Sequence, residues 1–159
     1  MRQWHKFARS FLRYAFAWEN YLLLARTLQA AQLVRRHLAT SANSPTLASA
    51  IAAVEPLYLS PQPGWRISDA EKIARFAGFI VGVPQTWGRC VQRSLIVYRL
   101  LNAYDIPARL CFGINRQNEQ LDGHAWVEKL AEPKRAFGES SDPYERYLPV
   151  YTSPLPAAQ

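Results

Sequence analysis

The spacing of apolar residues changes near Asn102, and this change restricts the fold more than any other feature of the sequence. Before it, apolar side chains recur every three to four residues, the period of α-helices that bury one face. After it come short segments rich in aromatic and β-branched residues, separated by turn-type residues, which is typical of antiparallel strands. Helices followed by strands predict an α+β protein whose N-terminal helices are segregated from a small antiparallel β-sheet.

The same patterns predict individual elements. We expect helices over residues 3–38 (one long helix or two abutting ones), 44–54, 67–80 and from Cys90 to about Asn102. Ser68 and Glu71 have the spacing of a capping box at the start of the third helix. The Pro-rich segment 55–65 is expected to be a loop. Three or four strands are expected within residues 106–114, 123–130, 135–139 and 147–151.

The 159 residues suffice for one domain that buries a core without disulfides or metals. Within this domain, the predicted loop 55–65 divides an N-terminal helical region, residues 1–65, from a core that carries the candidate catalytic residues, residues 66–150. The Pro-rich tail, residues 151–159, is expected to fray.

Almost all of the net charge of +7 lies in the first 40 residues, where seven Lys or Arg residues face one acidic residue, a net charge of +6. A basic amphipathic helix over residues 1–38 is either a solvated outer face or a weak contact for anionic lipid or an acidic partner. No nucleic-acid-binding motif accompanies the charge, so nucleic acid is not expected as a partner.

The start of the chain does not resemble a signal peptide, because charged residues interrupt its short apolar runs and no small-residue cleavage site follows. Cys90 and Cys111 are too few for a disulfide scaffold and lack the spacing of a zinc site. We therefore expect a soluble protein of the reducing cytoplasm, without a metal or other cofactor.

Cys90 is the strongest candidate for chemistry. It lies in the first turn of its predicted helix, where the helix dipole and unpaired N–H groups stabilise a thiolate, and Arg89 and Arg93 flank it. Those N–H groups can also hold the oxyanion that forms during acyl transfer. The alternative is that Cys90 is a small buried hydrophobic residue.

His124 is the candidate base. In GHAWVEKL it begins a strand-like alternation that places His124, Trp126 and Glu128 on one face. A histidine at the start of a strand can meet a helix N-terminus across the core and accept its proton. The alternative interpretation is that His124 has only a structural role.

A third group would orient the imidazole and stabilise the imidazolium. Glu139, on or just past the next predicted strand, is the natural supplier, and Asp142 lies three residues further on. Glu128 shares the strand and the face of His124, so the sequence leaves the acid open.

Four other residues have less marked features. Gln85 and Trp87 precede Cys90 and could line the oxyanion site or the substrate cleft. Cys111 alternates with apolar residues and is expected to be a core or sheet residue, and Ser94 to pack in its helix.

The segments CVQRS, IPARL and GHAWVE, in that order, resemble the transglutaminase-like cysteine peptidase superfamily. Within it, the chain is similar to the standalone leader peptidases of lasso-peptide biosynthesis. The resemblance covers about residues 66–150 and implies a transglutaminase-like, papain-like core in which the helix with the cysteine packs on the sheet. It also implies a bacterial cysteine peptidase that cleaves the leader from a ribosomally made precursor through an acyl-enzyme.

By this resemblance Cys90 is the nucleophile and His124 the general base. The family usually has an Asp about a dozen residues after the histidine, on the following strand. Here residue 136 is Ala. If the region is lengthened by a few residues, Glu139 takes the Asp position, and Asp142 is the alternative.

The resemblance also implies partners. They are the precursor with its leader, a separate leader-recognition protein with a winged-helix-like fold, and a lasso cyclase that uses the freed N-terminus. The recognition protein is expected to be separate because residues 1–65 are helical rather than strand-rich. Two other functions use the same residues: a transglutaminase-like acyltransferase, and a peptide-binding relative without catalysis.

Overall fold

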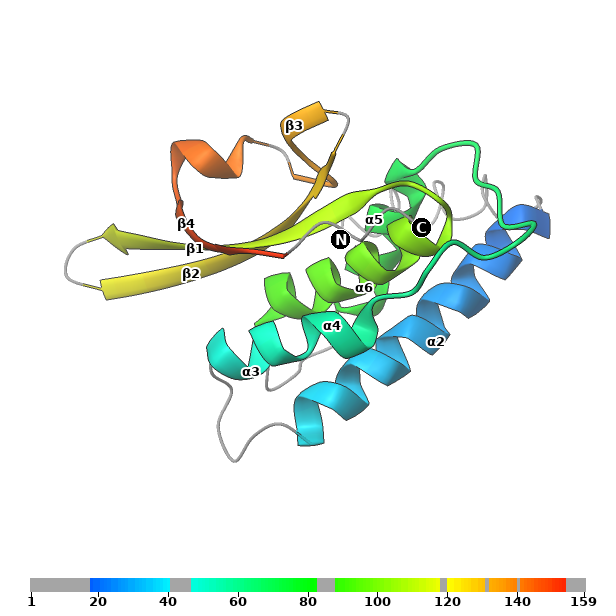
Figure 1. Ribbon diagram of the computed structural model, residues 1–159, viewed down its shortest axis with the longest axis horizontal. Helices are drawn as coiled ribbons and strands as arrows, with labels where there is room; N and C mark the ends of the chain where they lie inside the picture. The colour runs from blue at the N-terminus through cyan, green and yellow to red at the C-terminus, as the bar shows by residue number, and fades with distance from the viewer. Residues whose placement is uncertain are drawn as a thin grey trace, which may run out of the picture.

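The helix that begins beside Cys90 packs against a four-stranded antiparallel sheet in the computed structural model (Figure 1). The structure describes residues 18–40, 47–82, 88–117, 120–130, 132–139 and 141–153. The helices are α2 (Trp18–Thr40), α3 (Leu47–Ala52), α4 (Val54–Leu57), α5 (Glu71–Ile80), α6 (Arg89–Ala103) and the short 3₁₀ helix η1 (Pro143–Glu145). The strands are β1 (Ala108–Gln117), β2 (Gln120–Lys129), β3 (Glu132–Ala136) and β4 (Leu148–Thr152). The predicted α+β class is confirmed.

The sheet has the order β3-β2-β1-β4, and alternation along β1 and β2 divides it into two faces. Cross-strand pairs such as Leu110 with Val127 and Phe112 with Ala125 belong to the hydrophobic core. The intervening pairs, Gly113 with His124 and Cys111 with Trp126, lie on the opposite face. The sheet therefore presents one apolar face to the helices and one face with titratable groups.

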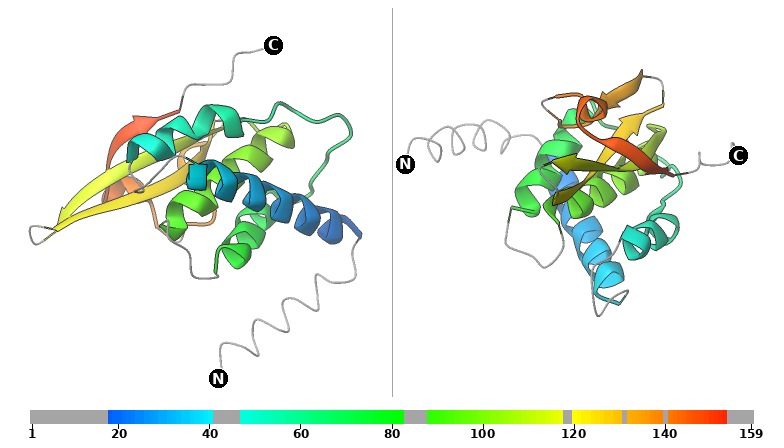
Figure 2. Two further views of the ribbon diagram at one scale, coloured as in Figure 1. Left: turned by 90° about the horizontal axis from the view of Figure 1, so that it is seen from below. Right: turned by 90° about the vertical axis from the view of Figure 1, so that its left-hand side faces the viewer.

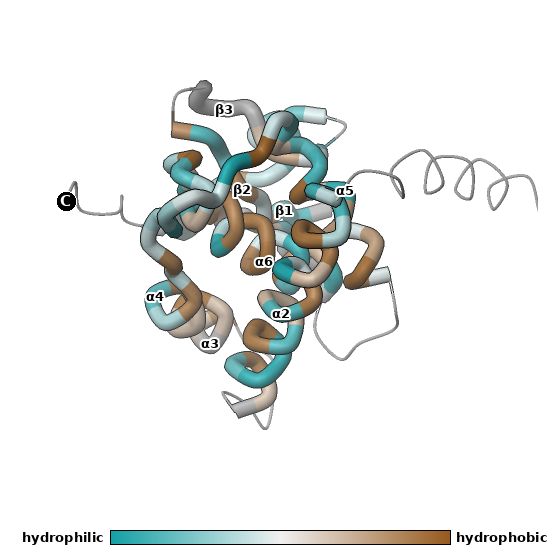
Figure 3. Tube along the Cα trace, turned by 90° about the vertical axis from the view of Figure 1, so that its right-hand side faces the viewer, coloured by the Kyte–Doolittle hydropathy of each residue, from teal (hydrophilic) through white to brown (hydrophobic). Residues whose placement is uncertain are grey.

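Helix α6 lies in the centre of the molecule, between the sheet and α2 (Figure 2). Its residues from Ser94 to Tyr98 are all buried, and hydrophobic residues gather where it meets its neighbours (Figure 3). Two side chains fix it to the sheet. Ser94 Oγ donates a hydrogen bond of 2.8 Å to the carbonyl oxygen of Ala125, and Asn102 bonds to the backbone of Ala108.

Helix α2 covers the side of α6 that faces away from the sheet, and it also packs on α5. Buried residues recur along it at helical spacing, namely Leu23, Thr27, Ala30, Val34 and Leu38. α2 thus shares one core with helices beyond residue 65. The division at that residue stays a prediction, as does the structure of residues 3–17 and 44–46, which lie outside the described residues.

Two helix boundaries differ from the predicted ones. α5 begins at Glu71 with Ala70 as its N-cap residue, and Asp69 rather than Ser68 accepts a hydrogen bond from the Glu71 N–H, at 3.0 Å. The predicted capping box is therefore wrong. The expected loop 55–65 begins with one helical turn, α4, because Pro56 is tolerated in the first turn of a helix.

The strands also differ in extent. β3 ends at Ala136, so Glu139 follows it after a turn. β4 includes Tyr151, as the strand expected over residues 147–151 does, and also Thr152, which was expected to fray. Ser153 is buried, and its Oγ accepts a hydrogen bond from the Leu110 N–H. Residues 154–159 lie outside the described residues. Among the helices that the structure describes, none is long and apolar enough to cross a membrane.

Candidate active site

Cys90 lies in the first turn of α6, directly after Arg89 and the N-cap residue Gly88, and it is partly buried. Burial opposes ionisation of the thiol, but hydrogen bonds with His124 and with the backbone of Ala125 and Val91 outweigh it. Together with the charge of His124 they lower the pKa of Cys90 below its usual value. The site thus makes the thiol of Cys90 easier to ionise than an ordinary cysteine thiol.

His124 lies on β2 with about one fifth of its side chain exposed. Its Nε2 is 3.6 Å from Glu139 Oε2, an electrostatic contact slightly longer than a hydrogen bond. The hydrogen bond with Cys90, followed by the contact with Glu139, raises the pKa of His124 to about 9 against the desolvating effect of burial. Because Nε2 faces Glu139, Nδ1 is the ring nitrogen left for the thiol.

Two aromatic rings hold the imidazole. The ring of Tyr147 stacks on it with centroids 4.9 Å apart, and the ring of Trp126 with centroids 6.1 Å apart. The Tyr147 hydroxyl donates a hydrogen bond of 2.9 Å to Asp122 Oδ2. A Cβ at Gly113, the cross-strand neighbour of His124, would lie 2.8 Å from the Trp126 ring and 2.9 Å from Tyr147 Cβ, so only glycine leaves room for both.

Glu139 follows the turn after β3 and is held by Arg93, which lies one turn beyond Cys90 on α6. Arg93 Nη1 donates to Glu139 Oε1 at 3.1 Å, and its Nη2 donates to the carbonyl oxygen of Phe137 at 3.1 Å. Burial raises the pKa of Glu139, but the contact with His124 and the charge of Arg93 outweigh it, so the pKa lies below its usual value. Glu139 is a carboxylate at neutral pH.

Gly138 lets the chain reach this position. Its φ is 66°, the left-handed region, and an added Cβ would lie 2.3 Å from Arg93 Nη2 and 2.7 Å from Ala74 Cβ. Its N–H donates to Glu71 Oε2 at 3.2 Å. A turn that only glycine can make therefore brings Glu139 to His124.

The other two acids have different partners. Asp142 is the N-cap residue of η1 and accepts a hydrogen bond of 3.0 Å from the Tyr144 N–H. Glu128 is fully buried and accepts hydrogen bonds from Arg109 at 2.9 Å and from Trp126 Nε1 at 3.1 Å. Of the three candidate acids, Glu139 is thus the one that the structure brings to the imidazole.

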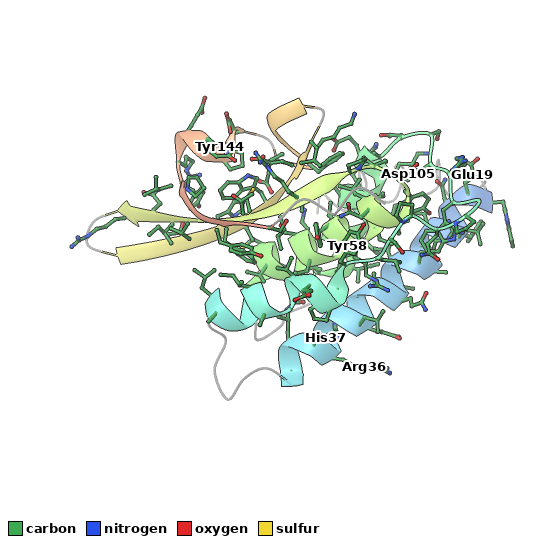
Figure 4. The ribbon with its side chains drawn as sticks, in the orientation of Figure 1. Glu19, Arg36, His37, Tyr58, Asp105 and Tyr144 are labelled. Atoms are coloured by element: carbon green, nitrogen blue, oxygen red, sulfur yellow. The ribbon has the colours of Figure 1, made fainter. Side chains whose placement is uncertain are left out.

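Cys111 is buried on the same face of the sheet, near Tyr144, which lies on the side of the sheet away from the helices (Figure 4). Burial, followed by the charge of Glu128, raises the pKa of Cys111 to about 11, so it stays a thiol. Gln85 and Trp87 lie outside the described residues, and their predicted roles stay predictions. Ser94 packs in its helix as expected.

Three contributors were not expected from the sequence in their observed roles. Arg93 was expected to act on the thiol, yet it bonds to Glu139. Its position three residues after Cys90 puts it on the same side of the helix, and this spacing could have indicated that Arg93 belongs to the site. Gly138 directly before Glu139 is a second signal, since glycine often supplies a turn. Tyr147 has no local signal.

An open cleft of about 440 Å³ lies beside Cys90, between α5, the start of α6 and the turn at Gly138. Three arginines, Arg75, Arg89 and Arg93, are among its lining residues. Within the described part of the chain, no group of three or more His, Cys, Asp or Glu residues could hold a metal ion.

A thiol in the first turn of a helix, an imidazole on an antiparallel strand and a carboxylate behind it have the arrangement of a cysteine-nucleophile site on an α+β fold. The chain belongs to the transglutaminase-like superfamily, whose family model matches residues 12–152. That superfamily includes cysteine peptidases and acyltransferases. No curated protein and no solved structure matches the chain.

Proposed function

We propose that this protein is a cysteine peptidase that cleaves the leader from a lasso-peptide precursor. The observation that carries the catalytic part of the proposal is the 3.6 Å contact between His124 Nε2 and Glu139 Oε2, at an imidazole that also interacts with Cys90 and lowers the pKa of its thiol. These groups lie beside an open cleft that leaves the thiol accessible to a peptide.

The reaction proceeds by acyl transfer through the thiolate. Cys90 Sγ attacks the scissile carbonyl carbon, and backbone N–H groups at the start of α6 stabilise the oxyanion. His124, charged in the resting ion pair, gives its proton to the departing amine as the C–N bond breaks. A water molecule then loses a proton to His124 and attacks the thioester carbonyl. The C–S bond breaks, which releases the new carboxyl group of the leader and restores the thiolate and imidazolium pair.

The leader-peptidase assignment rests on the resemblance of the CVQRS, IPARL and GHAWVE segments. Membership of the superfamily supports the broader class of cysteine-nucleophile chemistry. On this proposal the reaction takes place in the cytoplasm. A separate winged-helix-like protein delivers the precursor, and a cyclase uses the freed N-terminus. The basic segment 1–38 contacts that delivery protein or the leader through its positive charge.

The test is leader release, followed by mass spectrometry, from a lasso precursor in the presence of its recognition protein. Cys90→Ala should abolish release, whereas Cys111→Ala, which removes the buried thiol, should retain it. Glu139→Gln should lower the rate by more than about tenfold, because it removes the charge that stabilises the imidazolium. Asp142→Asn is the matched control, since Asn caps helices about as well as Asp.

Full activity in Cys90→Ala would disprove the mechanism, and a larger loss in Asp142→Asn than in Glu139→Gln would assign the acid to Asp142. An added primary amine distinguishes hydrolysis from acyl transfer. A leader with a free carboxylate supports the peptidase, whereas a leader joined to the amine identifies an acyltransferase. Intact precursor with every variant and with the wild type would indicate a relative that only binds peptide.

A further inference from the structure

We propose that the cleft beside Cys90 binds a carboxylate side chain of the peptide substrate, at a residue next to the scissile bond, and that Arg89 is the contacting residue. This inference rests on the proposed function, because it concerns the substrate of the same thiol. It adds the substrate class that the cleft selects, a peptide with Asp or Glu beside the bond that is cut.

The cleft is basic. Arg75 from α5 and Arg89 and Arg93 from α6 line it together with Cys90, and none of the described residues that line it is acidic. The remaining lining residues besides Cys90 are small or apolar, such as Gly78 and Val81, so they contribute no negative charge to the cleft. An occupant close to Cys90 is therefore held near several guanidinium groups.

The three arginines differ in their partners. Arg93 forms its ion pair with Glu139, and Arg75 forms one with Asp69. Arg89 is exposed and donates a hydrogen bond to the carbonyl oxygen of Gly82, and it forms no ion pair with a carboxylate within the described part of the chain. Arg89 thus carries the positive charge in this cleft that no carboxylate of the described chain neutralises.

A guanidinium prefers a carboxylate, because its planar N–H groups match the two oxygens of a carboxylate. Arg89 precedes Cys90 in the chain, so a side chain that reaches it belongs to a residue close to the bond attacked by Sγ. A substrate carboxylate bound there leaves the Arg93–Glu139 pair intact, and so does not compete with the positioning of His124.

The first experiment measures the field at the thiol without any turnover. Iodoacetate and iodoacetamide both alkylate the thiolate, so the ratio of their rates at Cys90 cancels the thiolate fraction and reports the local charge. Mass spectrometry of the Cys90 peptide separates this reaction from any at Cys111. In low salt, Arg89→Gln should lower the iodoacetate to iodoacetamide ratio several-fold.

Arg116→Gln is the control, since Arg116 is an exposed arginine on β1 and is not among the lining residues. An equal ratio in wild type and Arg89→Gln would overturn the inference, and so would an equal loss in Arg116→Gln, because the effect would then follow net charge rather than the cleft.

The second experiment uses lasso precursor peptides in which each residue flanking the scissile bond is replaced in turn by Glu or by Gln. The wild type should cleave one Glu peptide at least about tenfold faster than its Gln counterpart, the scale of one charge-assisted hydrogen bond. Arg89→Gln should bring this rate ratio close to one, and Arg89→Glu should prefer Lys at the same position.

Cleavage with no Glu preference at any position would overturn the inference and leave the proposed function intact. No cleavage of any peptide by the wild type would contradict the proposed function instead, and the alkylation ratio would then decide whether the cleft attracts anions.

Discussion

At the scale of single residues, the neighbours of His124 determine how readily its imidazole is protonated. Two stacked rings fix its plane, while a thiolate and a carboxylate face its two nitrogens. Each anionic neighbour favours the imidazolium, so the environment shifts the pair away from thiol and imidazole and towards thiolate and imidazolium. In the proposed reaction this shift favours attack by Cys90, because the thiolate and not the thiol is the nucleophilic form.

The first prediction concerns the protonation of His124. Its ring should titrate with a pKa near 9 in the wild type. Because the hydrogen bond with Cys90 is the largest cause of the shift, Cys90→Ala should move that pKa down towards the usual 6.5. The imidazole NMR resonances followed from pH 5 to 10 measure both values, and a wild-type titration near 6.5 would refute the ion pair.

At the scale of elements, the turn after β3 determines whether the site is complete. Helix α6 supplies both Cys90 and Arg93, so one element positions the thiol and holds the carboxylate of Glu139. Gly138 then lets the turn pass close to Arg93 and Ala74. The carboxylate is thus positioned by backbone conformation and by packing, and not only by its own side chain.

The second prediction tests this turn with Gly138→Ala. The left-handed φ costs alanine about 1–2 kcal/mol, and its Cβ would also collide with Arg93 and Ala74. We expect Glu139 to move away from the imidazole, so the pKa of His124 and the alkylation rate of Cys90 at neutral pH should both fall.

Gly64→Ala is a matched control for that variant. Gly64 also has a positive φ, 76°, but a Cβ there would have nothing within 4 Å. Gly64→Ala should therefore lose the stability that the backbone strain alone costs, with unchanged Cys90 reactivity. Equal effects of the two variants on alkylation would show that the turn does not position the acid.

The elements that could be predicted from the sequence are those in which apolar residues recur with the period of a helix or a strand. The helix from Cys90 and the alternation of His124, Trp126 and Glu128 were evident, because neighbouring side chains in a helix or strand share a face by local geometry. The start of α5 was misassigned because Asp69, one residue after Ser68, is an equally good cap.

Contacts between distant segments could not be predicted in the same way. Glu139 rather than Glu128 contacts the imidazole, because Glu128 accepts a hydrogen bond from Arg109 elsewhere on the same sheet face. Arg109 lies 19 residues from Glu128 along the chain. Tyr147 reaches His124 only because β4 pairs with β1. Such partners follow from the tertiary arrangement, which leaves no local periodicity in the sequence.

At the scale of the whole molecule, Arg26 connects the outermost helix to the rest. From α2 its guanidinium lies 3.7 Å from the ring centroid of Trp65, and its Nη1 donates a hydrogen bond of 2.8 Å to the Tyr104 hydroxyl. One cation thus joins α2, the segment before α5 and the end of α6. One basic residue of the predicted basic helix is therefore a structural contact rather than part of a solvated face.

The third prediction is that Arg26→Met lowers the free energy of unfolding by about 1–2 kcal/mol. This estimate combines one cation–π contact with one partly buried hydrogen bond, while the aliphatic stem is retained. Urea denaturation measures the change. Arg116→Met, on an exposed position of β1, should change it by less than about 0.5 kcal/mol, and an equal effect of both would show that the cation of Arg26 contributes nothing specific.

The two attachments of α6 have different consequences for the order of folding. Ser94 and Ala125, which join α6 to β2, are separated by 31 residues, whereas Arg26 and Tyr104 are separated by 78. Closing the longer loop costs about 0.8 kcal/mol more chain entropy. The helix and hairpin that carry the thiol and the imidazole are therefore the part expected to form first in the folding transition state, with α2 docking afterwards. A folding chain would then bring the thiol and the imidazole together before α2 covers α6.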